Sequence, residues 1–167
     1  MPNAATLPGG KANGSSALAI REFEKIELST RKAIAGPPRM TFDANDLCHA
    51  VGAIGNDIFY STSKDLEIWS PAKLVAKSTL LGLKIKPRLL IDDDRAALIY
   101  RSNDVATIKL GKLTDDGIEF SDSEFASESA WLDPEMLKTE DGWISVIDAS
   151  NRKLMTLRKD DLFSLAP

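Results

Sequence analysis

Short apolar stretches alternate with polar turns along most of the chain, and the order of these features repeats. Pro38, Pro87 and Pro134 lie 49 and 47 residues apart, and each precedes an apolar stretch. In each copy an acidic turn follows (DAND, DDD and EDG), and then a second apolar stretch. Apolar stretches this short, bounded by turn residues, predict β-strands rather than helices.

The second half of each copy continues the pattern. An asparagine follows the second strand at Asn56, Asn103 and Asn151, and asparagine tolerates the left-handed backbone of hairpin turns. A third strand comes next (DIFYS, VATIKL and KLMTL), and then a polar turn with an aspartate and an aromatic residue (SKDLEIW, TDDGIEF and RKDDLF). Four short strands in about 48 residues are typical of one blade of a β-propeller.

This repeat predicts the organisation of the chain. We expect an all-β fold with three four-stranded, propeller-like blades at about 37–85, 86–132 and 133–167, which together make half a propeller. Residues 1–16, rich in Gly, Ser, Ala and Asn, predict a flexible arm, and residues 17–36 predict the outer strand of a preceding blade. A β-sandwich, whose strands come at similar intervals, is the alternative architecture.

The polar turns carry a motif in degenerate form, because a hydroxyl residue and an aspartate precede an aromatic residue. The matching residues are Ser63, Asp65 and Trp69 in the first copy, Thr114, Asp116, Gly117 and Phe120 in the second, and Asp161 and Phe163 in the third. These turns resemble the Asp boxes of sialidase-type β-propellers and related glycosidase propellers. The resemblance covers 37–167 at the level of pattern, and it implies a fold rather than a function, since Asp boxes hold turns and do not catalyse.

The composition limits the function classes. The chain has 167 residues, of which 43% are hydrophobic and 28% charged, as in a soluble globular protein. A net charge of −4 argues against a nucleic-acid partner. No apolar run reaches the roughly 20 residues of a membrane span, and the first residues do not have the pattern of a signal peptide. We therefore expect a cytoplasmic or virion-associated protein without a membrane partner.

Cys48 is the single cysteine and His49 the single histidine, so no internal disulfide can form. Adjacent residues of a strand point to opposite faces, which argues against a shared metal site. Cys48 is predicted to be a small buried residue, and we expect neither a metal nor a cofactor.

Charged residues at matching positions of the repeat are the candidate ligand-binding groups. Arg39 and Arg88 each follow the repeat proline, while Glu135 takes this position in the third copy. Sialidase-type enzymes, which the repeats resemble, bind a carboxylate with three arginines, and Glu135 breaks that pattern. The three residues are therefore predicted to form an internal salt-bridge network, with binding of a sugar carboxylate as the alternative.

Other candidate residues for catalysis or sugar binding are few. Asp133 with Glu135 could form the carboxylate pair of a glycoside hydrolase, and Trp131 could stack on a sugar or on a partner protein. The resemblance also implies a tyrosine nucleophile, but Tyr60 and Tyr100 fall on middle strands and are predicted to pack inside the blades. Catalysis is therefore not the function we favour.

Three blades cannot close a ring, because propellers have about 4–8 blades, and the outer faces of the first and last sheets would be exposed in the isolated chain. We predict a non-catalytic structural or interaction subunit. It would complete a propeller by even-numbered self-association, or by docking on another protein of a larger assembly such as a virion or phage tail. The alternative is a glycan-binding or glycoside-hydrolysing propeller in which Arg39, Arg88 and Trp131 contact the sugar.

Overall fold

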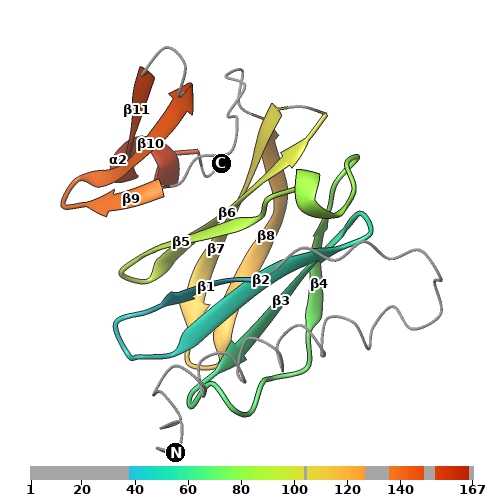
Figure 1. Ribbon diagram of the computed structural model, residues 1–167. Helices are drawn as coiled ribbons and strands as arrows, with labels where there is room; N and C mark the ends of the chain where they lie inside the picture. The colour runs from blue at the N-terminus through green and yellow to red at the C-terminus, as the bar shows by residue number, and fades with distance from the viewer. Residues whose placement is uncertain (1–37, 104, 127–135, 149–152, 166–167) are drawn as a thin grey trace, which may run out of the picture.

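The computed structural model describes residues 38–103, 105–126, 136–148 and 153–165, and these residues form three antiparallel sheets (Figure 1). The first sheet contains β1 (Arg39–Phe42), β2 (Cys48–Ile54), β3 (Asp57–Ser63) and β4 (Lys73–Lys77). The second contains β5 (Arg88–Asp92), β6 (Arg95–Ser102), β7 (Val105–Thr114) and β8 (Gly117–Ala126). The third contains β9 (Met136–Thr139), β10 (Gly142–Asp148) and β11 (Lys153–Arg158). The 3-10 helix η1 (Gly82–Lys84) precedes β5, and the short helix α2 (Lys159–Phe163) follows β11.

Each sheet is a meander in which every strand pairs with its neighbour in the chain. The prediction of an all-β fold is thus confirmed, and the first two predicted units each contain four strands. The asparagine prediction holds at the β6–β7 hairpin, where Asn103 has φ of 50°, but at the β2–β3 hairpin the left-handed residue is Gly55, with φ of 60°, rather than Asn56. Glycine and asparagine adopt this left-handed backbone at low cost, so these turns set the register of the hairpins.

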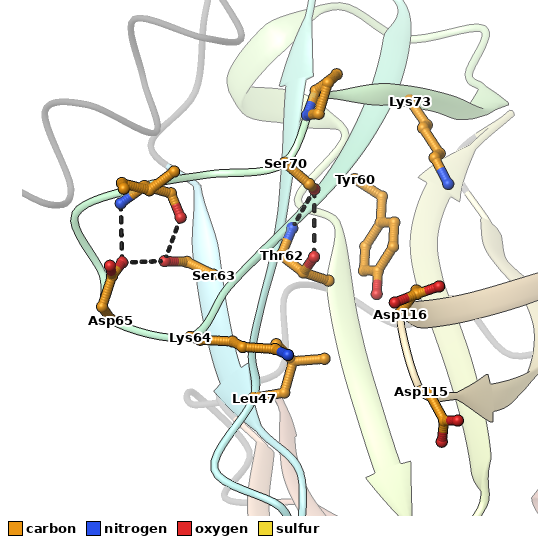
Figure 2. Close-up of a pocket in the computed structure, with 12 residues that line it drawn as sticks. Leu47, Tyr60, Thr62, Ser63, Lys64, Asp65, Ser70, Lys73, Asp115 and Asp116 are labelled. Carbon is orange, nitrogen blue, oxygen red and sulfur yellow. Dashed lines mark hydrogen bonds between the residues drawn. The ribbon is translucent and has the colours of Figure 1, made fainter.

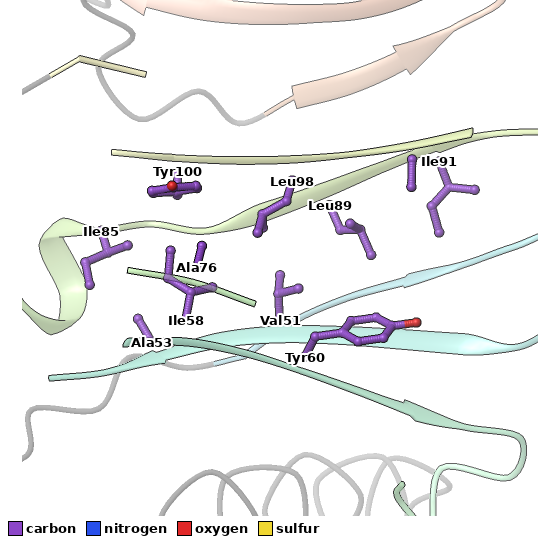
Figure 3. Close-up of a cluster of buried hydrophobic side chains, with 11 residues drawn as sticks. Val51, Ala53, Ile58, Tyr60, Ala76, Ile85, Leu89, Ile91, Leu98 and Tyr100 are labelled. Atoms are coloured by element: carbon purple, nitrogen blue, oxygen red, sulfur yellow. The ribbon is translucent and has the colours of Figure 1, made fainter. Parts of the chain in front are cut away.

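The first and second sheets pack face to face through alternate residues of their strands (Figure 3). On β2 and β3 the inward side chains lie opposite one another, with Val51 paired to Tyr60 and Ala53 to Ile58. Leu98 of β6 packs against them from the second sheet. The neighbouring residues of β6, such as Ala97, point to the opposite face of the second sheet, because side chains alternate along a strand.

The opposite face of the second sheet packs against the third sheet and α2. Ala97, Ile99 and Ile108 form one cluster with Trp143 of β10 and Leu162 of α2. The second sheet is therefore buried on both faces. This explains why β6 has a continuous apolar run instead of the apolar–polar alternation of a half-exposed strand.

The outer face of the first sheet differs from the expectation of an exposed apolar surface. Ile54 and Phe59 on this face are buried, and Trp69 and Ala72 pack against them. The loop after β3 contributes to this cover, because Ser70 donates its backbone N–H to the Thr62 carbonyl at 2.8 Å. The outer face is therefore covered only in part, because Leu74, which pairs with Phe59, is 50% exposed on it.

The third unit also departs from the sequence prediction. The segment RKDDLF was predicted to form an Asp-box turn and an outer strand, but Asp161 and Phe163 lie in helix α2. Acidic residues in the first turn favour a helix, and the Arg95 guanidinium lies over the Phe163 ring, 4.5 Å from its centre. Asp92 also holds this end of the chain, since it accepts Arg95 at 2.9 Å and Lys159 at 3.4 Å.

The predicted arm at 1–16, the predicted outer strand at 17–36 and the asparagine turn at Asn151 lie outside the described residues. In the ranges that the structure does describe, no helix is long and apolar enough to cross a membrane.

Leu98→Ala tests the packing of the first sheet on the second. The side chain is fully buried between these sheets, so its truncation should lower the free energy of unfolding by about 2–5 kcal/mol, measured by urea denaturation. Leu74→Ala is the matched control: Leu74 is 50% exposed on β4, and its truncation should change stability by less than about 0.5 kcal/mol. Equal losses in the two variants would contradict the described packing.

Candidate functional site

The first strands of the three sheets line a common groove, which we call the inner-strand groove. It has a volume of about 290 Å³. Its walls are residues 39–42 of β1, residues 88–91 of β5, Lys138 of β9 and Trp143 of β10. Side chains from three separate repeats therefore meet at this one place.

The inner-strand groove is cationic. Arg39 and Lys138 are exposed, Arg88 is half-buried, and none of the described residues that line the groove is acidic. The Lys138 ammonium donates to the Ile91 carbonyl at 3.2 Å, which joins β9 to β5. Guanidinium groups bind carboxylates and phosphates through two parallel hydrogen bonds, so the groove has the chemistry to bind an anionic group.

Exposed apolar side chains lie beside these cations. Met40 is 41% and Phe42 54% exposed on β1, which is an edge strand of the first sheet. An edge strand with exposed apolar residues is a common place for another chain to bind. Met40 and Phe42 alternate with Arg39 along β1, so the apolar contact surface lies on the other face of this edge strand from the Arg39 side chain.

The structure brings some of the predicted ligand-binding residues together. Arg39 and Arg88 line the same groove, as their matching positions in the repeat predicted. Trp131, Asp133 and Glu135 lie outside the described residues, so the salt-bridge role of Glu135 stays a prediction. Sequence reasoning missed Lys138, which comes four residues after Pro134 rather than one, although it is a basic residue in the same predicted strand.

The predicted turn at Ser63 and Asp65 is held by side-chain hydrogen bonds. The Asp65 carboxylate accepts the backbone N–H of Glu67 at 2.9 Å and of Ile68 at 2.8 Å. Ser63 Oγ accepts the N–H of Leu66 at 2.9 Å and donates to the Ile68 carbonyl at 2.7 Å. These bonds support a left-handed backbone at Leu66, whose φ is 63°. The N–H groups of Ile68 and Glu67 also hold the pKa of Asp65 below its ordinary value.

The second predicted turn, between β7 and β8, lies against the first sheet. Asp116 is a turn residue, and a Cβ atom on Gly117 would lie 2.7 Å from the Tyr60 hydroxyl oxygen. Gly117, with φ of 145°, is therefore required both by its backbone and by the close approach of β8 to Tyr60. Phe120 meets the Tyr60 ring edge-to-face at 5.6 Å, so the predicted anchoring role of Phe120 is confirmed.

Behind the second turn lies a chain of buried hydrogen bonds that links Asp43, His49 and Tyr60, which we call the buried polar chain. His49 is fully buried, with Nδ1 2.7 Å from the Tyr60 hydroxyl and Nε2 3.1 Å from an Asp43 carboxylate oxygen. The other Asp43 oxygen accepts the backbone N–H of Asn45 and of Leu47 at 2.8 and 3.0 Å. The β1–β2 turn is thereby joined to β2 and β3.

The hydrogen-bond partners determine the protonation of the buried polar chain. The Asp43 carboxylate can only accept, so the proton of the neutral His49 ring lies on Nε2, and the Tyr60 hydroxyl donates to His49 Nδ1. Burial lowers the pKa of His49 and outweighs the opposing effect of the Asp43 carboxylate. Burial would raise the pKa of Asp43, but the hydrogen bonds from His49, Asn45 and Leu47 bring it below its ordinary value.

A hydroxyl, an imidazole and a carboxylate in series have the connectivity of a catalytic triad, in which the hydroxyl oxygen, here that of Tyr60, would be the nucleophile. The Tyr60 oxygen, however, is covered by Gly117 and already bonded to His49. Burial raises the pKa of Tyr60, which opposes formation of the phenolate. The arrangement therefore fits a structural connection between the first and second sheets better than an activated nucleophile.

The other predicted buried residues are confirmed. Cys48 is fully buried, and burial raises the pKa of its thiol to about 11, so it is a poor nucleophile. Tyr100 is buried on β6, a middle strand of the second sheet, as predicted. Within the described ranges, no three His, Cys, Asp or Glu side chains are grouped so that they could hold a metal ion.

Comparison with known proteins finds no relative: no protein-family model, curated protein or solved structure matches this chain.

Tyr60→Phe tests the buried polar chain, because it removes the hydroxyl and keeps the ring that packs on Phe120. His49 Nδ1 would then lack its partner in a buried site, and the free energy of unfolding should fall by about 1–3 kcal/mol. In the control Tyr100→Phe, the lost hydroxyl lies near Glu124 but is not in hydrogen-bond geometry with a described residue, so the loss should be smaller. The reverse order of stabilities would contradict the described bonds.

The buried polar chain also predicts how the free energy of unfolding depends on pH. The folded state holds His49 neutral below its ordinary pKa of 6.5, whereas the unfolded chain takes up a proton there. Stability should therefore be constant above pH 6.5 and fall as the pH decreases from 6.5 toward the lower folded pKa, with a further loss below 3.8 from Asp43. Urea midpoints across this range should show the first slope in the native protein and lose it in His49→Gln.

Because His49 is the only histidine, its ¹⁵N resonances can be assigned without ambiguity. They should report a neutral ring with the proton on Nε2. A ring protonated at pH 6.5, or a proton on Nδ1, would show that the inferred hydrogen-bond directions are wrong.

Proposed function

We propose that the protein is a non-catalytic interaction subunit that binds an acidic segment of a partner protein in the inner-strand groove. The observation that carries this proposal is the meeting of Arg39, Arg88 and Lys138, from three different sheets, in one groove. The chain as a whole has a net charge of −4, so this local excess of positive charge is not a property of the whole surface. Such a local field steers an acidic partner toward the groove.

The apolar residues of β1 support a protein ligand rather than a free ion. Met40 and Phe42 are exposed next to Arg39, although β1 is part of a sheet with a well-formed core. Partner-binding surfaces commonly place apolar anchors beside charged groups, because the anchors supply affinity and the charges supply specificity. An acidic segment with an aromatic or aliphatic anchor would match both features.

The arrangement of the sheets is compatible with a propeller-like assembly. Each sheet is a meander, and the first strand of each lines the groove, as the inner strands of consecutive blades would. In this proposal the remaining sheets of a ring come from the partner, or from a second copy of the chain that would give six.

The alternative ligand is an acidic glycan. A sugar carboxylate could form bidentate hydrogen bonds to Arg39 or Arg88, and the polar walls of the groove would suit a sugar. This alternative predicts binding of a single acidic sugar, whereas a peptide-binding groove needs the apolar contacts at Met40 and Phe42 as well.

Arg39→Glu tests the proposal, because Arg39 is exposed and its replacement should leave the fold intact. Poly-L-glutamate serves as a model acidic segment, and its affinity should fall about tenfold in Arg39→Glu, with a smaller difference at high salt. Lys84→Glu, an equal change of charge on η1, should bind like the native protein. Equal weakening by both variants would mean that only the net charge matters and would contradict a site at the groove.

Phe42→Ala separates the two ligands. If the groove binds a peptide, this variant should bind a segment that combines glutamates with a leucine more weakly than the native protein does. If the groove binds glycans, the variant should bind sialic acid as the native protein does. Native mass at low and high concentration completes the test: a monomer agrees with partner docking, and an even oligomer that survives dilution assigns the groove to a second copy instead.

A further inference from the structure

A second pocket lies beside Tyr60, between the Ser63–Asp65 turn and the β7–β8 hairpin, and we call it the side pocket (Figure 2). Its volume is about 510 Å³. Figure 2 shows the Ser63–Asp65 turn on one side and Asp115 and Asp116 on the other, with Tyr60 between them. Neither the buried polar chain nor the inner-strand groove accounts for this pocket.

The hydroxyl groups of the side pocket are already used within the protein. Ser70 Oγ accepts from the backbone N–H of Thr62 at 2.9 Å and lies 3.2 Å from the Thr62 hydroxyl. The hydroxyl of Ser63 holds the turn, and that of Tyr60 belongs to the buried polar chain. A ligand would therefore find few neutral groups that are free to form hydrogen bonds.

The charged side chains of the pocket, by contrast, are free. Lys64, Lys73, Asp115 and Asp116 are all exposed, and none of them forms an ion pair with another described residue. Charges of both signs thus line one pocket without neutralising each other. A ligand with one negative and one positive group could pair with both, and a ligand with a single charge would leave the other pair of side chains without a partner.

Apolar side chains complete the wall. Leu47 and Pro71 line the pocket, and Ile68 beside them is 76% exposed. An exposed isoleucine held by the ordered Ser63–Asp65 turn offers a contact for an aliphatic group. The pocket therefore combines two opposite charges with a small apolar surface.

We propose that the side pocket binds a small zwitterion with an aliphatic side chain, of the class of the apolar α-amino acids. Lys64 and Lys73 pair with the carboxylate of the ligand, Asp115 and Asp116 with its ammonium group, and Leu47 and Ile68 contact its side chain. The assignment is independent of the inner-strand groove, because Arg39 and Arg88 take no part in it.

The buried polar chain acts on this pocket through the position of the β7–β8 hairpin. Gly117, the residue after Asp116, lies against the Tyr60 hydroxyl, and Phe120 packs edge-to-face on the Tyr60 ring at 5.6 Å. Tyr60 and His49 are therefore positioning residues that hold Asp115 and Asp116 at the pocket, and they do not contact the ligand through a free hydrogen-bonding group.

Leucine is the probe for the test, with two analogues that each lack one charge. Calorimetric titration of the full chain should show binding of leucine, while N-acetylleucine, without the ammonium group, and leucinamide, without the carboxylate, should each bind at least about tenfold more weakly. No detectable binding of leucine, or equal binding of either analogue, would overturn the proposal.

Variants then locate the site. Asp116→Asn and Lys73→Gln should each weaken leucine binding about tenfold with no loss of folding, since both side chains are exposed. Lys84→Gln, away from the pocket, and Arg39→Glu, in the inner-strand groove, should bind leucine like the native protein. Native-like binding by both pocket variants would overturn the site. Failure of poly-L-glutamate binding with intact leucine binding would contradict only the function proposed for the groove.

Discussion

The burial of β6 on both faces is the constraint on which the rest of the structure depends. Leu98 and Tyr100 point to the first sheet, and Ala97 and Ile99 point to the third sheet and α2. Interiors are close-packed, so neither neighbouring layer can shift without opening a cavity or overlapping β6. Because the three layers are fixed in this way, their first strands are held beside one another, and the cations of the inner-strand groove are brought together.

The buried polar chain adds directional contacts to this apolar packing. Apolar side chains can often repack at moderate cost, but the His49 ring satisfies Asp43 and Tyr60 in one position only, and Tyr60 is also held against Gly117 and Phe120. The buried polar chain thus couples the β1–β2 turn to β8 of the next sheet. Apolar packing determines which faces meet, and these bonds determine the register in which they meet.

The sequence alone was sufficient for features that depend on neighbouring residues and insufficient for those that depend on distant ones. Turn residues such as Gly55 and Asn103 identify the hairpins directly, and the matching positions of Arg39 and Arg88 place both at one groove. The helix α2 was missed because its residues fit a polar turn equally well, and only the contacts of Phe163 with Arg95 and of Lys159 with Asp92 favour the helix.

The pairing of His49 with Tyr60 could have been found from the sequence, since a hairpin that turns at Gly55 and Asn56 places both side chains on the same face, in diagonal positions. The hydrogen bond of Asp43 to His49 could not have been found from the sequence, because it depends on how the acidic turn folds back over β2. The same reasoning applies to the two pockets. The arginines at matching positions of the first two sheets were visible in the sequence, whereas the side pocket joins a turn of the first sheet to a hairpin of the second, and that contact exists only after the layers pack.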